Sequence, residues 1–123
     1  MSEWGFAQRE TGKAGVEAYL TKQVHDVLGG KAYKWNSPGN RGVPDRIVLL
    51  PGGWVLLVET KAPGKNPRPS QIKVFERMFG VYGQQVTVVA SKVDVDRFVG
   101  YCRRLMQYPN SRNEHKQEVF RDF

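Results

Sequence analysis

Residues 41–61 read RGVPDRIVLLPGGWVLLVETK, and this stretch gives the strongest indication of the fold. It holds two apolar runs, 45–50 and 54–59, separated by a Pro-Gly-Gly turn, and this pattern predicts two antiparallel strands joined as a hairpin. Because both runs are apolar at successive positions, they are typical of a sheet that is covered on both faces. The hairpin therefore predicts a sheet in the interior of the protein.

The sequence around the hairpin predicts helices and further strands. Apolar residues at helical spacing indicate helices over 13–28 and 71–79, and a third helix that begins after Ser91. Short strands are expected over 32–35 and 84–90. The order helix, strand, hairpin, helix, strand, helix is typical of an α/β fold with a mixed central sheet of about four strands flanked by helices.

The length of 123 residues suits a single domain. We expect its core to span about 12–107 and its ends, 1–11 and 108–123, to be flexible or docking segments. No stretch approaches the ~20 apolar residues of a membrane span. The N-terminus lacks the basic and then apolar order of a signal peptide, so a cytoplasmic location is expected. The single cysteine, Cys102, excludes an intrachain disulfide, and no cluster of cysteine and histidine indicates a zinc site.

The charge balance favours a nucleic-acid ligand. The chain has 19 basic and 12 acidic residues, which gives a net charge of +7. Basic proteins bind nucleic acid by neutralising phosphates and releasing counterions. Charge by itself leaves open the alternative that the basic surface serves solubility alone.

Two carboxylates are expected side by side at one end of the hairpin. Asp45 begins the first strand and Glu59 ends the second, and these two positions lie opposite each other in an antiparallel pair. Adjacent carboxylates repel unless a cation lies between them, and a hard divalent cation prefers such oxygen ligands. Lys61 shares a face with Glu59, because residues two apart in a strand point the same way. For the Glu-x-Lys tripeptide alone, the alternative is a surface strand end with a weak salt bridge.

Two further polar residues fall on faces that are expected to be buried. Glu17 lies close to the centre of the apolar stripe of the first helix, and Gln71 lies on the apolar face of the second. Each residue has an alternative interpretation without a function. Glu17 could be a glutamate at the edge of the stripe that reaches water, and Gln71 could be an ordinary first-turn glutamine. Together with the hairpin residues they favour one site. Lys13 lies off the stripe and is expected in solvent.

The order of these residues resembles the PD-(D/E)xK nuclease superfamily and, within it, the VRR-NUC (virus-type replication-repair nuclease) branch. The resemblance runs from about residue 12 to about residue 92 and rests on Glu17, Gly42-Val43-Pro44-Asp45, Glu59-Thr60-Lys61 and Gln71. The shortness of the chain resembles the stand-alone members found in phages. The resemblance implies a restriction-endonuclease-like fold and metal-dependent hydrolysis of DNA phosphodiester bonds by an endonuclease.

The resemblance also implies a role for each site residue. Asp45 and Glu59, with the backbone carbonyl of Thr60 beside them and Glu17 completing the acidic cluster, are the implied ligands of Mg²⁺ or Mn²⁺. Lys61 is implied to orient or activate the attacking water and to stabilise the charge on the phosphate. Gln71 is implied to be a supporting residue. The expected catalytic side chains are therefore Glu17, Asp45, Glu59, Lys61 and Gln71.

The DNA is expected to contact basic residues around this site. Arg41 precedes the aspartate closely, and Lys65, Arg68 and Lys73 follow Lys61, so these four side chains are the candidate phosphate contacts. No helix that would read bases is indicated, which favours recognition of DNA structure or backbone over base sequence.

Branched DNA and a homodimer are the finer expectations. Stand-alone VRR-NUC proteins resemble Holliday-junction resolvases, which implies a structure-selective endonuclease that is encoded by a phage and acts in the host cell. Symmetric cleavage of two strands calls for two active sites, and a two-fold homodimer supplies them. The aromatic residues that are candidates for its interface are Trp4, Phe6, Tyr82, Tyr101 and Tyr108. The alternatives are a nuclease of ordinary duplex or single-stranded DNA and a non-catalytic nucleic-acid-binding module.

Overall fold

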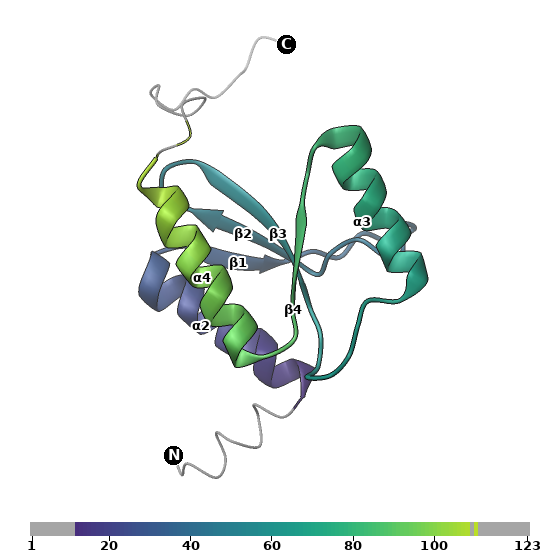
Figure 1. The fold of residues 1–123 in the computed structure, drawn as a ribbon, viewed down its shortest axis with the longest axis horizontal. Helices are drawn as coiled ribbons and strands as arrows, with labels where there is room; N and C mark the ends of the chain where they lie inside the picture. Colours follow the sequence, from purple (N-terminus) through teal and green to yellow (C-terminus); the bar gives the residue numbers. More distant parts are fainter. Residues whose placement is uncertain (1–11, 109, 111–123) are drawn as a thin grey trace.

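The computed structural model describes residues 12–108 and residue 110. In chain order the elements are α2 (Lys13–Leu28), β1 (Lys31–Lys34), β2 (Arg46–Leu50), β3 (Trp54–Thr60), α3 (Pro69–Tyr82), β4 (Val86–Val89) and α4 (Lys92–Met106). This order confirms the predicted α/β fold with a mixed sheet and flanking helices (Figure 1). The two ends that were predicted to be flexible or docking segments lie outside the described residues, apart from Tyr108 and Asn110.

The sheet has four strands in the order β1-β2-β3-β4. β2 and β3 form the predicted antiparallel hairpin, in which Arg46 lies opposite Val58. β1 pairs antiparallel with β2, and β4 pairs parallel with β3 after the crossover through α3. Because β3 and β4 run in the same direction, their carboxyl ends meet, with Thr60 opposite Val89. The proposed site residues lie at this end of β3.

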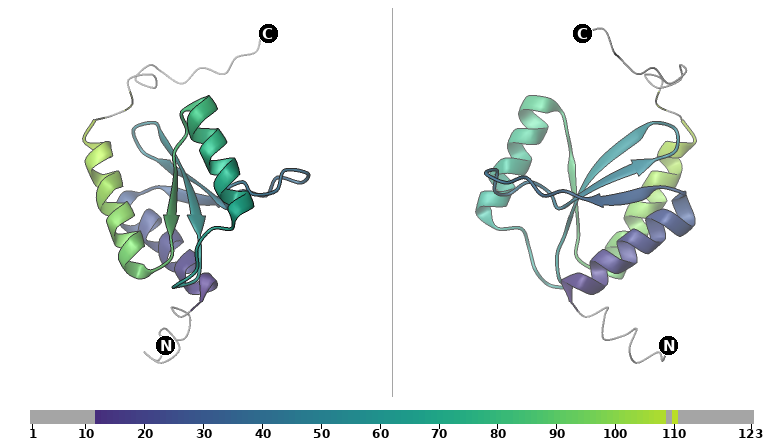
Figure 2. Two further views of the ribbon diagram at one scale, coloured as in Figure 1. Left: turned by 45° about the vertical axis from the view of Figure 1, so that its right-hand side comes forward. Right: turned by 180° about the vertical axis from the view of Figure 1, so that it is seen from behind.

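The core lies between the sheet and the helix pair α2 and α4, which pack against each other on one face of the sheet (Figures 1 and 2). Helix α2 contributes Val16, Leu20, Val24 and Leu28, which recur at the spacing of one helical face. The side chains buried with them are Ala32, Val48, Leu50, Val58, Val89, Val95, Phe98, Val99 and Cys102. Removal of this apolar surface from water is the main force that fixes α2 against the sheet.

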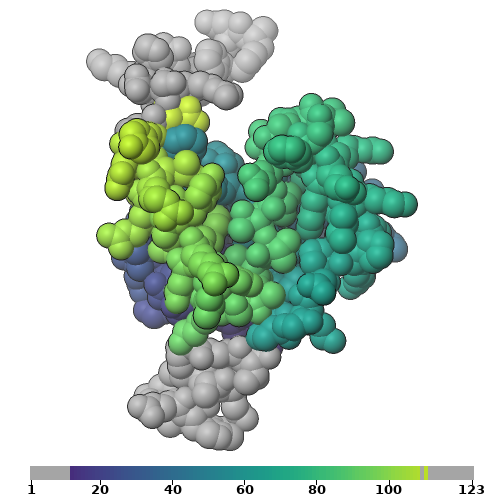
Figure 3. Space-filling view, in the orientation of Figure 1, coloured from purple at the N-terminus to yellow at the C-terminus, as the bar shows by residue number. Residues whose placement is uncertain are grey.

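The other face of the sheet is less covered than the sequence predicted. Leu49 and Val55 on the hairpin are 41% and 57% exposed. Helix α3 packs against β4, lies beyond it at the edge of the sheet (Figures 2 and 3), and has no buried residue. Its predicted apolar stripe includes Phe79, which is 62% exposed. The prediction of a sheet covered on both faces was wrong here, because an apolar pattern does not specify which element covers it.

Two helix ends show where local sequence decides the boundary. Helix α3 was predicted to stop before Gly80, but it continues to Tyr82 and ends at Gly83, which has the left-handed φ of 69° typical of a helix C-cap. Helix α4 begins after Ser91 as predicted, and the Ser91 hydroxyl accepts a hydrogen bond of 3.0 Å from the Asp94 N–H. In the described part of the chain, no helix is long and apolar enough to cross a membrane.

Candidate active site

Asp45 and Glu59 lie next to each other at the end of the β2–β3 hairpin. Glu59 Oε1 accepts a hydrogen bond of 3.1 Å from the Asp45 N–H. In return, Asp45 Oδ1 accepts a hydrogen bond of 3.0 Å from the Thr60 N–H. Glu59 is only 2% exposed, and a carboxylate at such a buried position needs hydrogen-bond donors. The reciprocal bonds between the two chain segments fix both carboxylates in place.

Glu17 reaches the same strand end from helix α2, through the side chain of Thr60. The Thr60 hydroxyl is completely buried and lies 2.6 Å from Asp45 Oδ2 and 3.2 Å from Glu17 Oε1. Arg46 Nη2 lies 3.5 Å from Glu17 Oε2 and compensates its charge. The sequence assigned only the backbone carbonyl of Thr60 to the site. The buried hydroxyl was missed, although strand alternation points it toward α2.

Lys61 and Gln71 contact Glu59 and each other. Lys61 Nζ donates to Gln71 Oε1 at 2.8 Å and lies 3.3 Å from Glu59 Oε2. The Gln71 amide donates to Glu59 Oε2 at 3.2 Å, and its oxygen also accepts from the Arg68 N–H at 2.9 Å. This last bond is the back half of a capping box, so Gln71 fixes the start of α3 and holds Lys61 at the same time.

The three carboxylates approach the strand end from two sides of the sheet. Glu59 and Lys61 point toward α3, whereas Thr60 between them points toward α2 and Glu17. Among the described residues, no group of three or more acidic, histidine or cysteine side chains is placed to hold a metal ion. The acidic cluster expected from the sequence is therefore a pair, Asp45 and Glu59, to which Glu17 is attached through Thr60.

Lys13 lies in this site, contrary to the expectation that it is solvated. Its ammonium lies 3.0 Å from Asp45 Oδ2 and 3.8 Å from Glu17 Oε1. Partial burial lowers the pKa of Lys13, but the hydrogen bond to Asp45 and the charges of Asp45, Glu59 and Glu17 outweigh it, so that the pKa lies above its ordinary value. The available signal was its position four residues before Glu17, where helical side chains meet.

Two comparisons with known proteins identify the family, although no family model matches the sequence. A curated relative is 48% identical over 77 residues, which make up 63% of this chain and 81% of the relative. It is named "Putative nuclease p44" and comes from Acyrthosiphon pisum secondary endosymbiont phage 1. A solved VRR-NUC domain is 35% identical, with a TM-score of 0.64 over 73% of this chain and 97% of that domain. The chain belongs to the VRR-NUC family.

Membership in the VRR-NUC family confirms the resemblance and the restriction-endonuclease-like fold expected from the sequence. It also raises the question of whether the residues present suit a divalent metal ion. Asp45 and Glu59 offer only oxygen atoms, and Mg²⁺ is usually held by one or two carboxylates, with water and substrate phosphate as its other ligands. The ammonium of Lys13 beside Asp45 shows that the Asp45 carboxylate attracts a cation. The donor set of this VRR-NUC protein therefore fits magnesium.

The four predicted DNA contacts of the VRR-NUC protein lie on the α3 side of the site. Arg41 and Lys73 line one open pocket between the loop after β1 and helix α3. Lys65 and Arg68 are exposed on the loop that leads from Lys61 into α3. These four cations are therefore accessible to a ligand.

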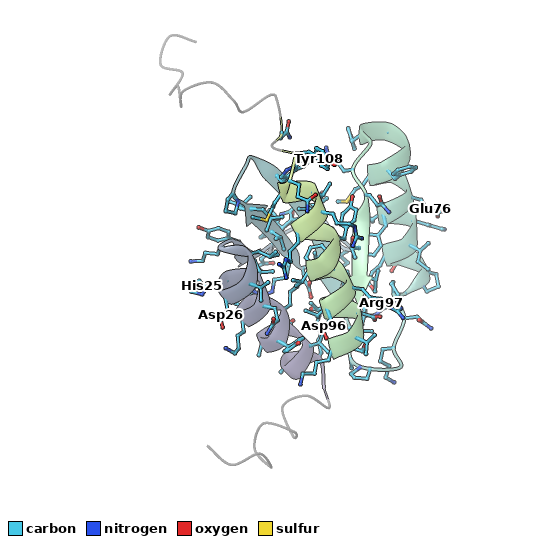
Figure 4. The ribbon with its side chains drawn as sticks, turned by 60° about the vertical axis from the view of Figure 1, so that its left-hand side comes forward. His25, Asp26, Glu76, Asp96, Arg97 and Tyr108 are labelled. Atoms are coloured by element: carbon cyan, nitrogen blue, oxygen red, sulfur yellow. The ribbon has the colours of Figure 1, made fainter. Side chains whose placement is uncertain are left out.

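His25 and Glu76, two further titratable residues of the VRR-NUC fold, are labelled in Figure 4. His25 lies near the far end of α2, is 80% exposed at its side chain, and has its Nδ1 atom 2.9 Å from Asp26. Glu76 lies on the exposed side of α3. The chemistry of the site therefore rests on residues at the end of β3 and their neighbours.

Proposed function

We propose that this VRR-NUC protein is a metal-dependent DNA endonuclease that hydrolyses phosphodiester bonds. The observation that carries the proposal is a pair of hydrogen bonds, in which the Asp45 N–H donates to Glu59 and the Thr60 N–H donates to Asp45. These bonds fix two carboxylates at one strand end, where Glu59 lies 3.3 Å from the ammonium of Lys61. Two anions and one cation at the end of a hairpin can together bind a metal ion and a phosphate. The name of the phage relative supports the same class of activity.

Asp45 and Glu59 are the proposed side-chain ligands of Mg²⁺ or Mn²⁺, with the carbonyl of Thr60 beside them. When bound, the ion makes a water molecule a better nucleophile at neutral pH and offsets negative charge on the phosphate. Glu17 is the third acidic residue proposed for the metal site. It is connected to Asp45 by the Thr60 hydroxyl, which lies within hydrogen-bond distance of both carboxylates. Its part is to keep Asp45 in position and to add negative charge.

Lys61 is the proposed catalytic cation. Its ammonium has three N–H groups, and Gln71 and Glu59 lie along two of them. The remaining N–H can meet the attacking water or a phosphate oxygen. A cation that is already fixed stabilises charge as it develops, with no reorganisation during the reaction. Gln71 is the proposed positioning residue, because it holds Lys61 and contacts Glu59.

DNA is the proposed substrate, because the chain is basic and the cations gather on one side of the site. The net charge is +7, and Arg41, Lys65, Arg68 and Lys73 are exposed. Such side chains neutralise backbone phosphates, which supplies affinity without reading bases.

Branched DNA such as a Holliday junction, cut by a homodimer, is the finer part of the proposal. The exposed aromatics Tyr82, Tyr101 and Tyr108 (69%, 44% and 72% exposed) offer apolar surface to a second copy. Trp4 and Phe6, the other candidates, lie outside the described residues. We propose that the protein is phage-encoded and acts in the cytoplasm of the host cell, which the phage origin of its relative supports.

One experiment tests the activity and its substrate together. Purified protein is incubated with a four-way junction, a flap and a linear duplex, each in Mg²⁺, Mn²⁺ or EDTA. We expect cleavage of the junction in either metal and none in EDTA. Equal cleavage of the linear duplex would remove the branched-DNA part of the proposal. Tight binding without cleavage in any metal would show a non-catalytic binding module.

A further inference from the structure

An open pocket of about 580 Å³ lies between helix α3 and the loop that joins β1 to β2. This volume falls in the range of sites that hold a small organic ligand. The loop side contributes Trp35, Arg41 and Val43 to its lining, and the α3 side contributes Lys73, Arg77 and Tyr82. We call the space lined by these residues the Trp35 pocket.

A backbone hydrogen bond connects the wall of the Trp35 pocket to the candidate active site. The Trp35 N–H donates to the Asp45 carbonyl at 2.8 Å, so the pocket wall and the catalytic aspartate are paired directly. On the opposite wall, Val74 lies three residues after Gln71 and therefore on the same side of α3. A ligand in the pocket therefore lies next to the proposed site, on the side of Lys61 and Gln71.

The lining has the chemistry of a nucleotide site. Arg41, Lys73 and Arg77 bring three positive charges, and none of the described residues that line the pocket is acidic. Trp35 and Tyr82 bring two aromatic rings, and Met78 and Val74 add apolar surface from the helix. Cations bind phosphate, and aromatic rings stack on bases of any sequence.

We propose that the Trp35 pocket holds one unpaired nucleotide of the bound DNA strand, adjacent to the phosphate that is cleaved. This inference rests on the proposed nuclease function and specifies its substrate as DNA with a single-stranded or unpaired segment. A base within a duplex is stacked on its neighbours and cannot offer its face to Trp35, whereas a base at a branch point, flap or single strand can. The pocket thereby selects branched DNA by the unpaired base.

Binding in EDTA tests the pocket without cleavage. Fluorescence anisotropy measures the affinity of the full chain for a labelled short oligothymidylate and for a blunt duplex of the same length. We expect Trp35→Ala and Tyr82→Ala each to weaken binding of the oligothymidylate about tenfold, since loss of one stacking ring costs about that much. Binding of the duplex should change by less than about twofold, because phosphate contacts dominate it.

A matched pair of arginine variants tests the charge of the pocket, and two aromatic variants control for loss of the fold. Arg77→Ala should weaken oligothymidylate binding and lower its salt dependence by about one unit of slope. Arg103→Ala, an exposed arginine on α4, removes the same charge outside the pocket and should leave both properties unchanged. Trp35→Phe keeps a ring and should retain most of the affinity. Because the Tyr82 side chain is exposed, Tyr82→Ala keeps the test valid if Trp35→Ala does not fold.

The outcomes separate the pocket from the nuclease. Three results would overturn the nucleotide pocket, even if the protein cuts junctions. The first is an equal loss of affinity for the oligothymidylate and for the duplex, and the second is no loss of affinity in either aromatic variant. The third is that the unmodified protein does not bind the oligothymidylate. Selective loss of oligothymidylate binding supports the pocket, even if no substrate is cut. If no substrate is cut, the proposed nuclease function fails, and only the binding of an unpaired nucleotide in the Trp35 pocket stands.

Discussion

The ammonium of Lys13 lies 3.0 Å from Asp45 Oδ2, on the carboxylate proposed to bind a metal ion. A cation of the protein itself therefore compensates the charge of Asp45. A divalent ion that binds Asp45 has to compete with this ammonium. Since the side chain of Lys13 is 45% exposed, the pair is worth at most about 1 kcal/mol.

Lys13→Met should tighten Mn²⁺ binding about two- to fivefold, because the competing charge is removed while the length of the side chain is kept. A Mn²⁺ titration followed by electron paramagnetic resonance measures the dissociation constant. Lys22→Met is the matched control. Lys22 pairs with Asp26 on α2 at the i to i+4 spacing that Lys13 has with Glu17, but it lies away from the site. Weaker Mn²⁺ binding by Lys13→Met would mean that Lys13 organises Asp45 for the metal.

Thr60→Val should destabilise the protein by about 1–2 kcal/mol, because it removes a buried hydroxyl that contacts Asp45 and Glu17 while keeping the shape of the side chain. Urea unfolding in EDTA measures the change. Thr21→Val is the control, since its hydroxyl bonds a backbone carbonyl at an exposed position, and it should cost less than about 0.5 kcal/mol. Equal losses in the two variants would show that the Thr60 hydroxyl has no special role.

Gly42→Ala and Gly39→Ala form a second matched pair. Both glycines have left-handed φ, +88° and +82°, so both substitutions bring backbone strain. A Cβ at Gly42 would also lie 2.9 Å from Val74 Cγ2, whereas one at Gly39 would meet no atom within 4 Å. We expect Gly42→Ala to cost about 1–3 kcal/mol more than Gly39→Ala and to reduce cleavage by displacing α3 and Gln71. Similar stability in the two variants would argue against close packing of this loop on α3.

The thiol of Cys102 should resist alkylation in the native protein. Complete burial raises its pKa to about 12, so it is protonated and inaccessible at pH 8. Its raised pKa stabilises the fold fully below the ordinary value of 9.0, and this contribution is lost as the pH rises from there toward 12. Iodoacetamide labelling followed by mass spectrometry should be slow until urea is added. In Cys102→Ala, the loss of stability above about pH 9 should be smaller. Equal labelling rates with and without urea would contradict the burial.

The sequence predicted the centre of the site better than its surroundings. Asp45 and Glu59 could be placed together because strand period and hairpin geometry are local properties of the chain. Lys13 was assigned to solvent, because a helical wheel ranks positions by hydrophobicity and ignores how far a lysine reaches. The exposed face of α3, with Phe79 at 62% exposure, was missed because an amphipathic pattern shows an apolar face and not its partner.

Glu17 shows most clearly what the periodicity of a sequence cannot predict. Its place within an apolar stripe predicted a functional carboxylate, and its contact with Thr60 brings it to the expected strand end. Its side of the sheet, opposite to Glu59, depends on how α2 packs on the sheet through Val16, Leu20 and their partners. Long-range packing of this kind cannot be read from periodicity alone.

Asp45 and Lys61 are the residues on which the proposed metal-dependent phosphodiester hydrolysis depends most. Its most direct test is the cleavage rate of a labelled four-way junction in Mg²⁺ by the unmodified protein, Asp45→Asn and Lys61→Ala, with junction affinity measured in EDTA for all three. We predict that each substitution lowers the rate at least about a hundredfold, as loss of a charge-stabilising group does, while affinity changes by less than about threefold. Cleavage at the unmodified rate by either variant would contradict the account.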